Sequence, residues 1–245
     1  PHHPIAKRVQ SMVPNEMDIG RLGRYVIDGE TGEILTAKVI YSSPYTWSTG
    51  LYAYRSQSPS GMPPERIDNI YWNSFGLWQE MMTKFLFELY QDYKYRVVPL
   101  KDLLDMAQQG IPSCVFRLHT SEDVMTIADS YQFPDGYIGS SPQFIPRCGS
   151  KEGSTDGYII CTVFTPNRSE FWIFDAANLA KGPMCKLSHQ DLNFSFSIHT
   201  AWLPKIGRRQ ASYNIPVRPD YQELVAQKSP EIQKLFEDEV YPHFE

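Results

Sequence analysis

The residues of this sequence best suited to metal chemistry are its six histidines: His2, His3, His119, His189, His199 and His243. Neutral imidazole binds transition metals such as Fe(II). No two of these histidines form an HxH or HExxH pair, so their spacing alone defines no metal site. His199 differs from the others because it ends an alternating segment, residues 193–199, that is typical of a β-strand.

A strand end can project its side chain into the mouth of a channel, and this is the functional interpretation of His199. The alternative from the residues alone is a half-buried histidine that is hydrogen-bonded to a backbone carbonyl. The sequence contains no GxSxG, GxGxxG or P-loop motif, which argues against the hydrolases and nucleotide-binding enzymes that use them.

Composition narrows the class of protein. The 245 residues carry a formal charge of −5, which argues against a nucleic-acid-binding surface. Aromatic residues make up 13%, which suits a β-rich protein or one that handles an apolar ligand. Four cysteines without a CxxC pair predict free thiols and a cytoplasmic location. No run of 18 apolar residues occurs, so no membrane-spanning helix is expected.

Short alternating segments separated by turn signals predict mostly β structure. A hairpin is expected from residues 24–27 and 34–41, around the turn-forming residues 28–32. Further strands are expected at residues 51–55, 115–118, 124–128, 158–165, 170–174 and 193–199. Many short strands of this kind indicate a barrel, a sandwich or a propeller.

Helical periodicity is confined to three regions. Apolar residues at three- and four-residue spacing predict one long helix from about Ile70 to Tyr95, whose Met and aromatic stripe favours packing over a cofactor site. A shorter helix is expected over Leu100–Gln109. The tail predicts a helix over Pro219–Gln227 and another that begins at Pro230.

Four stretches in order resemble the C-terminal part of the carotenoid cleavage oxygenase family. They are GSSPQFIPR at 139–147, STDGYII at 154–160, FWIFDAA at 171–177 and FSIHTAWLP at 196–204. Their order and spacing carry the resemblance over roughly residues 136–204. A weaker likeness covers residues 22–33, which resemble a hairpin of the same family.

The resemblance implies an all-β fold, a seven-bladed β-propeller with one Fe(II) on its axis held by four histidines. It also implies a non-haem dioxygenase that adds O2 across a conjugated carbon–carbon double bond of a carotenoid, apocarotenoid or stilbene-like substrate. By position, His199 matches the last of the four iron ligands. Phe196 and Trp202 are candidates for shaping the substrate tunnel, with core packing as the alternative.

A propeller of this size needs far more than 245 residues, and one histidine cannot hold a catalytic iron. We therefore expect residues 1–245 to be the C-terminal portion of one propeller domain, with a helical insertion at about 56–112. The remaining ligands are expected on a second chain or on an N-terminal segment. His2 and His3 match the family's ligand motif poorly.

The sequence departs from the family where a glutamate supports a ligand histidine, because the matching residue here is Ser141. A serine oxygen can accept the same hydrogen bond but brings no charge. Ser42-Ser43-Pro44 similarly lacks a carboxylate at a second position. Asp156 and Asp175 fall in matching motifs, where turn and strand-capping roles are expected.

These departures keep an alternative open, namely a catalytically altered or inactive propeller subunit for binding or assembly. A second alternative is an unrelated β-rich module that binds carbohydrate or protein. The expected partners of the oxygenase are an apolar polyene or stilbene-like molecule and O2, with peripheral membrane contact left open and no nucleic acid. A polyene is almost entirely apolar, so burial would supply most of its affinity.

Overall fold

The computed structural model describes residues 16–57, 61–121, 124–150, 153–194, 196, 200–203, 206–207 and 217–244. The chain divides into two compact units, Pro1–Trp202 and Leu203–Glu245. None of the helices described is long and apolar enough to cross a lipid bilayer.

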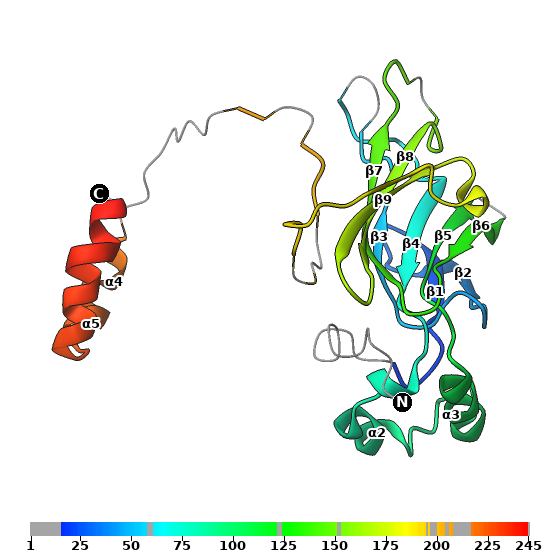
Figure 1. The fold of residues 1–245 in the computed structure, drawn as a ribbon, viewed down its shortest axis with the longest axis horizontal. Coiled ribbons are helices and arrows are strands. Elements are labelled where there is room, and N and C mark those ends of the chain that lie inside the picture. The colour runs from blue at the N-terminus through cyan, green and yellow to red at the C-terminus, as the bar shows by residue number, and fades with distance from the viewer. Residues whose placement is uncertain are drawn as a thin grey trace. The chain divides into compact units, whose positions relative to one another are not determined.

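The first unit is mostly β-sheet with a few short helices (Figure 1). Its strands are β1 (Leu22–Ile27), β2 (Ile34–Ile40), β3 (Thr49–Ala53), β4 (Asn69–Ser74), β5 (Cys114–Thr120), β6 (Met125–Gln132), β7 (Ile138–Pro146), β8 (Gly157–Phe164), β9 (Ser169–Asp175) and β10 (Cys185–Leu187). Its helices are the 3-10 turn η1 (Gln79–Met81), α2 (Lys84–Tyr90), α3 (Leu100–Gln109) and the 3-10 turn η2 (Leu179–Lys181).

Two of the sheets are four-stranded antiparallel meanders, β3-β4-β5-β6 and β7-β8-β9-β10, in which every strand pairs with its neighbour in the sequence. Strand β7 lies against β3, β4 and β5, so the two sheets stack. Propellers are built from repeated sheets of this kind. The prediction of mostly β structure is confirmed. The described residues form no closed propeller, so the seven-bladed architecture stays a prediction.

The core between the two sheets follows from the alternation of side chains along each strand. Tyr71 from β4 and Trp172 from β9 are fully buried and belong to one apolar cluster with Phe133 and Phe174. The Tyr71 hydroxyl donates to the carbonyl of Ala176 at 2.9 Å. Burial raises the pKa of Tyr71 because the phenolate would lose its hydration. This buried cluster fixes the packing of the two sheets against each other.

The long helix predicted from Ile70 to Tyr95 is wrong. Residues 69–74 form β4, a central strand between β3 and β5, and α2 covers only Lys84–Tyr90. Gly76 lies in the turn just after β4: its φ is +82°, and a Cβ there would lie 2.1 Å from the carbonyl oxygen of Ile111. Strand β4 lies inside the range 56–112, for which a helical insertion was predicted. The extent of that insertion stays a prediction.

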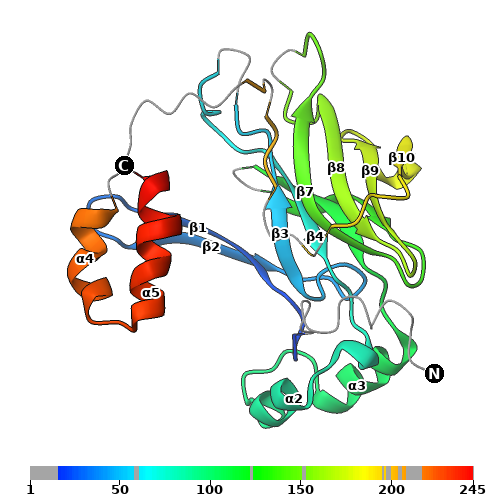
Figure 2. The ribbon, with the colours of Figure 1, turned by 60° about the vertical axis from the view of Figure 1, so that its left-hand side comes forward.

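The predicted hairpin is confirmed as the two-stranded sheet β1-β2, which extends as a ribbon away from the stacked sheets (Figure 2). The helix predicted over Leu100–Gln109 is also confirmed. All four cysteines are free thiols, as expected.

The second unit holds α4 (Arg218–Ala226), α5 (Pro230–Leu235), the π-helical turn Phe236–Val240 and the 3-10 turn Tyr241–His243. Both tail helices were predicted, including the start at Pro230. Arg218 forms a bidentate pair with Glu237 at 2.7 and 2.9 Å and lies over the ring of the buried Tyr241. Whether residues 1–245 form one propeller domain stays a prediction.

Candidate functional site

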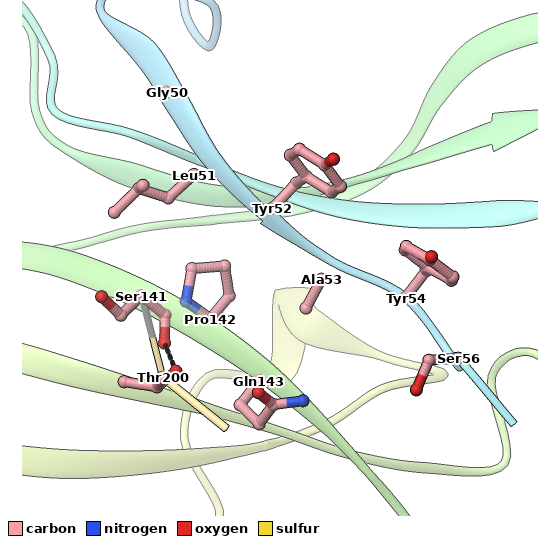
Figure 3. A pocket seen from close by; sticks show the side chains of 10 residues that line it. All are labelled: Gly50, Leu51, Tyr52, Ala53, Tyr54, Ser56, Ser141, Pro142, Gln143 and Thr200. Carbon is pink, nitrogen blue, oxygen red and sulfur yellow. Dashed lines mark hydrogen bonds between the residues drawn. The ribbon is translucent and has the colours of Figure 1, made fainter. Parts of the chain in front are cut away.

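A pocket of about 290 Å³ lies where two of the four stretches singled out in the sequence meet (Figure 3). One wall is β7 and the other is β3 with the residues just after it. The residues that line the pocket are Gly50, Leu51, Tyr52, Ala53, Tyr54, Ser56, Ser141, Pro142, Gln143 and Thr200. Residues 139–147 and 196–204, which are far apart along the chain, thus contribute to one site.

Strand β7 is interrupted at this point by a bulge. Its register with β8 shifts between Ser140 and Gln143, and Ser141 has a φ of +44°. Positive φ is uncommon for a residue with a Cβ, and Pro142 has no N–H to donate to the ladder. Bulges re-aim side chains and are frequent beside binding and active sites. Here the bulge directs Ser141 and Pro142 into the lining of the pocket.

Buried hydrogen bonds from both sheets hold Gly139 and Ser140, the two residues before Ser141. The Asn73 side chain of β4 donates to the carbonyl of Gly139 at 2.7 Å, and the Thr162 hydroxyl of β8 donates to the carbonyl of Ser140 at 3.1 Å. The backbone N–H of Gly139 donates to the Ser113 hydroxyl at 3.2 Å. A strained residue persists only where its surroundings fix it, and these contacts do so.

Thr200 contacts the bulge itself, at Ser141 and Gln143. Its hydroxyl donates to the carbonyl of Ser141 at 3.3 Å. With its amide nitrogen turned toward Thr200, Gln143 donates to the Thr200 carbonyl at 3.0 Å. His199 directly precedes Thr200 but lies outside the described residues, as do His2 and His3. Its role as an iron ligand therefore stays a prediction.

A second hollow, of about 350 Å³, adjoins the first through Ser141, Gln143 and Thr200. It lies on the outer face of the β7–β10 sheet, and its other lining residues are Ile145, Ile160, Thr162, Phe171, Ile173, Leu187, Ala201 and Trp202. Trp202 thus lines a hollow, as a residue that shapes a substrate tunnel would. Phe196 instead packs on Phe75 and Phe164, with ring centroids 5.5 and 6.0 Å apart, in an apolar cluster.

The lining of the first pocket is electrically neutral. The lining residues that the structure describes offer hydroxyl, phenol and carboxamide groups but no carboxylate, thiol or imidazole. Across the part of the chain that the structure describes, no three His, Cys, Asp or Glu side chains gather into a metal site. Neutral oxygen donors do not match the imidazole set that suits Fe(II). The described lining alone therefore does not fit an iron ion.

Other sequence candidates have structural roles. Arg147 pairs with Asp156 at 3.3 Å and lies 3.6 Å from Asp175, and Asp175 accepts from the N–H of Ala177 at 2.9 Å. These contacts agree with the turn and capping roles expected for both aspartates. On the surface, the His189 Nδ1 accepts from the backbone N–H of Asp191 at 3.2 Å.

The residues of β3 were missed as functional candidates. The alternation in residues 51–55 predicted a strand, but not that Leu51 and Ala53 would face a pocket, with Tyr52 and Tyr54 on the other side of the strand. Their rings are near parallel, with centroids 6.5 Å apart, and Tyr52 also contacts Trp72 at 4.8 Å. The i, i+2 spacing of Leu51 and Ala53 was the available signal, since it places both on one face of a strand.

Comparisons with known proteins agree with the resemblance. Residues 92–204 match the model of the family described as Retinal pigment epithelial membrane protein. A curated relative, Resveratrol cleavage oxygenase 1 of Chaetomium globosum, is 41% identical over 64 residues, which cover 25% of this chain and 10% of the relative. The predicted likeness to the carotenoid cleavage oxygenases is therefore confirmed.

Solved structures with a similar arrangement include the Synechocystis apocarotenoid oxygenase, in its Glu150Gln mutant, with a TM-score of 0.45 and 16% identity. That match covers 75% of this chain and 30% of the other. The Pseudomonas brassicacearum lignostilbene dioxygenase has a TM-score of 0.46 and 15% identity, over 75% of this chain and 32% of the other. The chain thus spans about a third or less of the length of these relatives.

Proposed function

We propose that this chain is the C-terminal part of a propeller oxygenase that cleaves a conjugated carbon–carbon double bond of an apolar polyene or stilbene-like substrate. O2 is the co-substrate, and each carbon of the double bond leaves as a carbonyl. The observation that carries the proposal is the meeting of residues 139–147 and 196–204 at one pocket, through the 3.3 Å contact between Thr200 and Ser141. The family match over residues 92–204 supports the same reaction class.

The described residues account for binding rather than for the oxidation itself. Leu51 and Ala53 give the first pocket an aliphatic wall, and Phe171 and Trp202 continue it with aromatic rings in the adjoining hollow. Each tenfold in affinity needs about 1.4 kcal/mol, which burial of roughly 50–60 Å² of apolar surface supplies. The lining residues that the structure describes suit such a substrate, because none of them carries a charge that must lose its hydration when the substrate enters.

Fe(II) is part of the proposal, with His199 as one ligand. The other histidine ligands would come from a second chain or from an N-terminal segment of the same protein, and the protein would work in the cytoplasm. Ser141 stands at the position of the supporting glutamate and places a neutral group there. The rival is a subunit that keeps the propeller but has lost the chemistry, and an assay of stilbene cleavage separates the two.

The test is oxidative cleavage of a stilbene by the full-length protein. Purified protein with resveratrol and air is expected to release two aldehydes, detected by mass spectrometry, and to release none without O2. Leu51→Ala should lower kcat/KM by about tenfold, since it shortens an apolar side chain in the wall of the pocket. The matched control is Leu100→Ala: both leucines are half-buried, but Leu100 lies outside the lining.

Binding of resveratrol without products would support the inactive subunit. Neither binding nor cleavage of a stilbene or an apocarotenoid would refute both forms of the proposal.

A further inference from the structure

The second unit contains an antiparallel pair of helices, α4 and α5, which we name the tail hairpin together with the turns that continue α5 to residue 243 (Figure 2). The Arg218 guanidinium at the start of α4 pairs with the Glu237 carboxylate after α5, at 2.7 Å. Toward the other end, the Gln233 side chain donates to the carbonyl of Ala226 at 3.1 Å. The tail hairpin is thus held together along its length, and it lies outside the residues that match the family model.

Each helix of the tail hairpin carries an apolar stripe that is open to solvent. Tyr221 and Leu224 on α4 are 48% and 55% exposed. Ile232 and Leu235 on α5 have the same spacing and are 40% and 48% exposed. Because residues three apart lie on one face of a helix, each pair forms a stripe that lies apart from buried residues such as Val225.

The two stripes project to the same side of the tail hairpin. Leu224 directly precedes Val225, which is buried, and Ile232 directly precedes Gln233, which bonds to α4. Each residue advances a helix by about 100°. Since the helices are antiparallel, one step back from the inner side brings Leu224 and Ile232 out on the same side. The stripes therefore share one apolar face.

The size of the tail hairpin requires that this face be covered. Units below about 40 residues usually need disulfides, a metal or oligomerisation to be stable. Residues 203–245 contain no cysteine, and the described residues of the chain contain no group of side chains that could hold a metal. Burial of the apolar face against another polypeptide is the remaining source of stability.

The charges of the tail hairpin indicate what covers the face. Lys228 lies in the turn between the two helices, and Asp238 and Glu239 lie in the π-helical turn at the opposite end. A second copy that is turned end for end places Lys228 of each copy beside the acids of the other, so the face is complementary to itself. Acidic residues outnumber basic ones in the tail hairpin, which disfavours an anionic lipid surface.

We propose that the tail hairpin is a dimerisation element, whose apolar face packs on the same face of a second copy of this chain to form a four-helix bundle. Tyr221, Leu224, Ile232 and Leu235 of both copies fill the core of the bundle. Apolar pairs at three-residue spacing on neighbouring helices are the usual core positions of such bundles. The inference goes beyond the proposed function and depends on neither iron nor cleavage activity.

The test compares Leu224→Asp with Leu89→Asp in the full-length protein, whose mass is measured by sedimentation equilibrium over a range of concentrations. Both leucines are helical and are 55% and 56% exposed, but Leu89 lies on α2 in the first unit. The unmodified protein is expected to dimerise with a Kd on the order of 10 µM, as suits a small interface. Leu224→Asp should raise this Kd at least about 100-fold, because each dimer then buries two added charges. Leu89→Asp should change it less than about threefold.

Three results would overturn the proposal. The first is an unmodified protein that stays monomeric at roughly 200 µM, well above the expected Kd. The second is a dimer that Leu224→Asp leaves intact or that Leu89→Asp weakens equally. The third is a lowered Tm of Leu224→Asp in a protein that is monomeric throughout, which would show that another part of the same protein covers the face.

Charge reversal keeps the test informative if Leu224→Asp fails to fold. Lys228 and Glu239 are exposed, so reversing their charges leaves the core of each copy unchanged. Lys228→Glu and Glu239→Lys should each raise the Kd about fivefold at low salt, because each contact occurs twice in the dimer. The variant with both changes exchanges the two charges and should return to within about twofold of the unmodified protein. A double variant no tighter than the single ones would overturn the end-for-end dimer.

Discussion

The two faces of the β7–β10 sheet have different roles. The face toward the β3–β6 sheet holds fully buried residues, among them Ile159, Cys161 and Trp172. On the other face, Phe171 and Ile173 are half-buried, Leu187 is 49% exposed, and the hollow beside Ser141 lies there. One sheet thus separates a layer that sets stability from a surface that is available for a ligand or for further polypeptide.

The largest effect expected from this comparison separates two adjacent residues of β9. Trp172→Ala should cost about 3–5 kcal/mol of unfolding free energy, because it opens a cavity in a closed layer. Phe171→Ala, on the other face, should cost about 1 kcal/mol, because the ring is only half-buried. Chemical denaturation of both variants measures the difference. Similar losses for the two would contradict the distinction between the faces.

A second prediction concerns the polar bridge between the sheets. Asn73 donates to the carbonyls of Gly139 and Cys114, at 2.7 and 3.3 Å, so Asn73→Ala leaves buried carbonyls without a donor. The expected cost is about 1–3 kcal/mol. Asn167→Ala, in an exposed turn, is the control and should change stability by less than about 0.5 kcal/mol. An Asn73→Ala protein of unchanged stability would show that the bridge is dispensable.

The cysteines of the unmodified protein allow buried and open parts of the molecule to be compared without mutation. Burial raises the pKa of the Cys161 thiol on the closed face to about 12, and that of Cys114 likewise to about 12. In the native protein a thiol reagent at pH 8 should therefore label only Cys148 and Cys185, which are exposed. Rapid labelling of Cys161 would show that the layer between the sheets opens readily.

The raised pKa values of the two thiols also set the direction in which the stability of the protein changes with pH. The folded state keeps the protons of Cys114 and Cys161 above pH 9, where the unfolded thiols lose them. The stability contributed by the two neutral thiols is present below pH 9 and is lost as pH rises toward about 12. Denaturation between pH 8 and 10.5 should show a falling unfolding free energy, with a shallower fall in Cys161→Ala.

The smallest expected effect lies on the open face. Thr200→Val removes the hydroxyl that donates to Ser141 and should cost at most about 1 kcal/mol, because Thr200 is exposed. Its effect on kcat/KM for a stilbene should exceed its effect on stability, since Thr200 lines the pocket. An unchanged kcat/KM would show that Thr200 contributes neither to binding nor to cleavage of the substrate.

The parts of the fold that the sequence predicted are those set by local pattern. The β1–β2 hairpin follows from its turn residues, and α3 follows from its periodicity. The sequence of β4 does not predict a strand, because Ile70, Tyr71 and Trp72 are apolar in succession. Both faces of β4 are covered by other parts of the protein, so its sequence lacks the alternation of apolar and polar residues that marks a half-buried strand. The pocket could be predicted only in part. Ser141 came from the resemblance, whereas the β3 wall arises from sheet stacking, which no local pattern encodes.

The most direct test of the account is the iron content of the full-length protein in two histidine variants. His199→Ala is expected to lose most of the bound iron measured by elemental analysis, because His199 is the proposed ligand. His189→Ala is the matched control and should keep it, since that side chain is 69% exposed beside Asp191. Equal iron in both variants, or no iron in the unmodified protein, would contradict the proposed metal site.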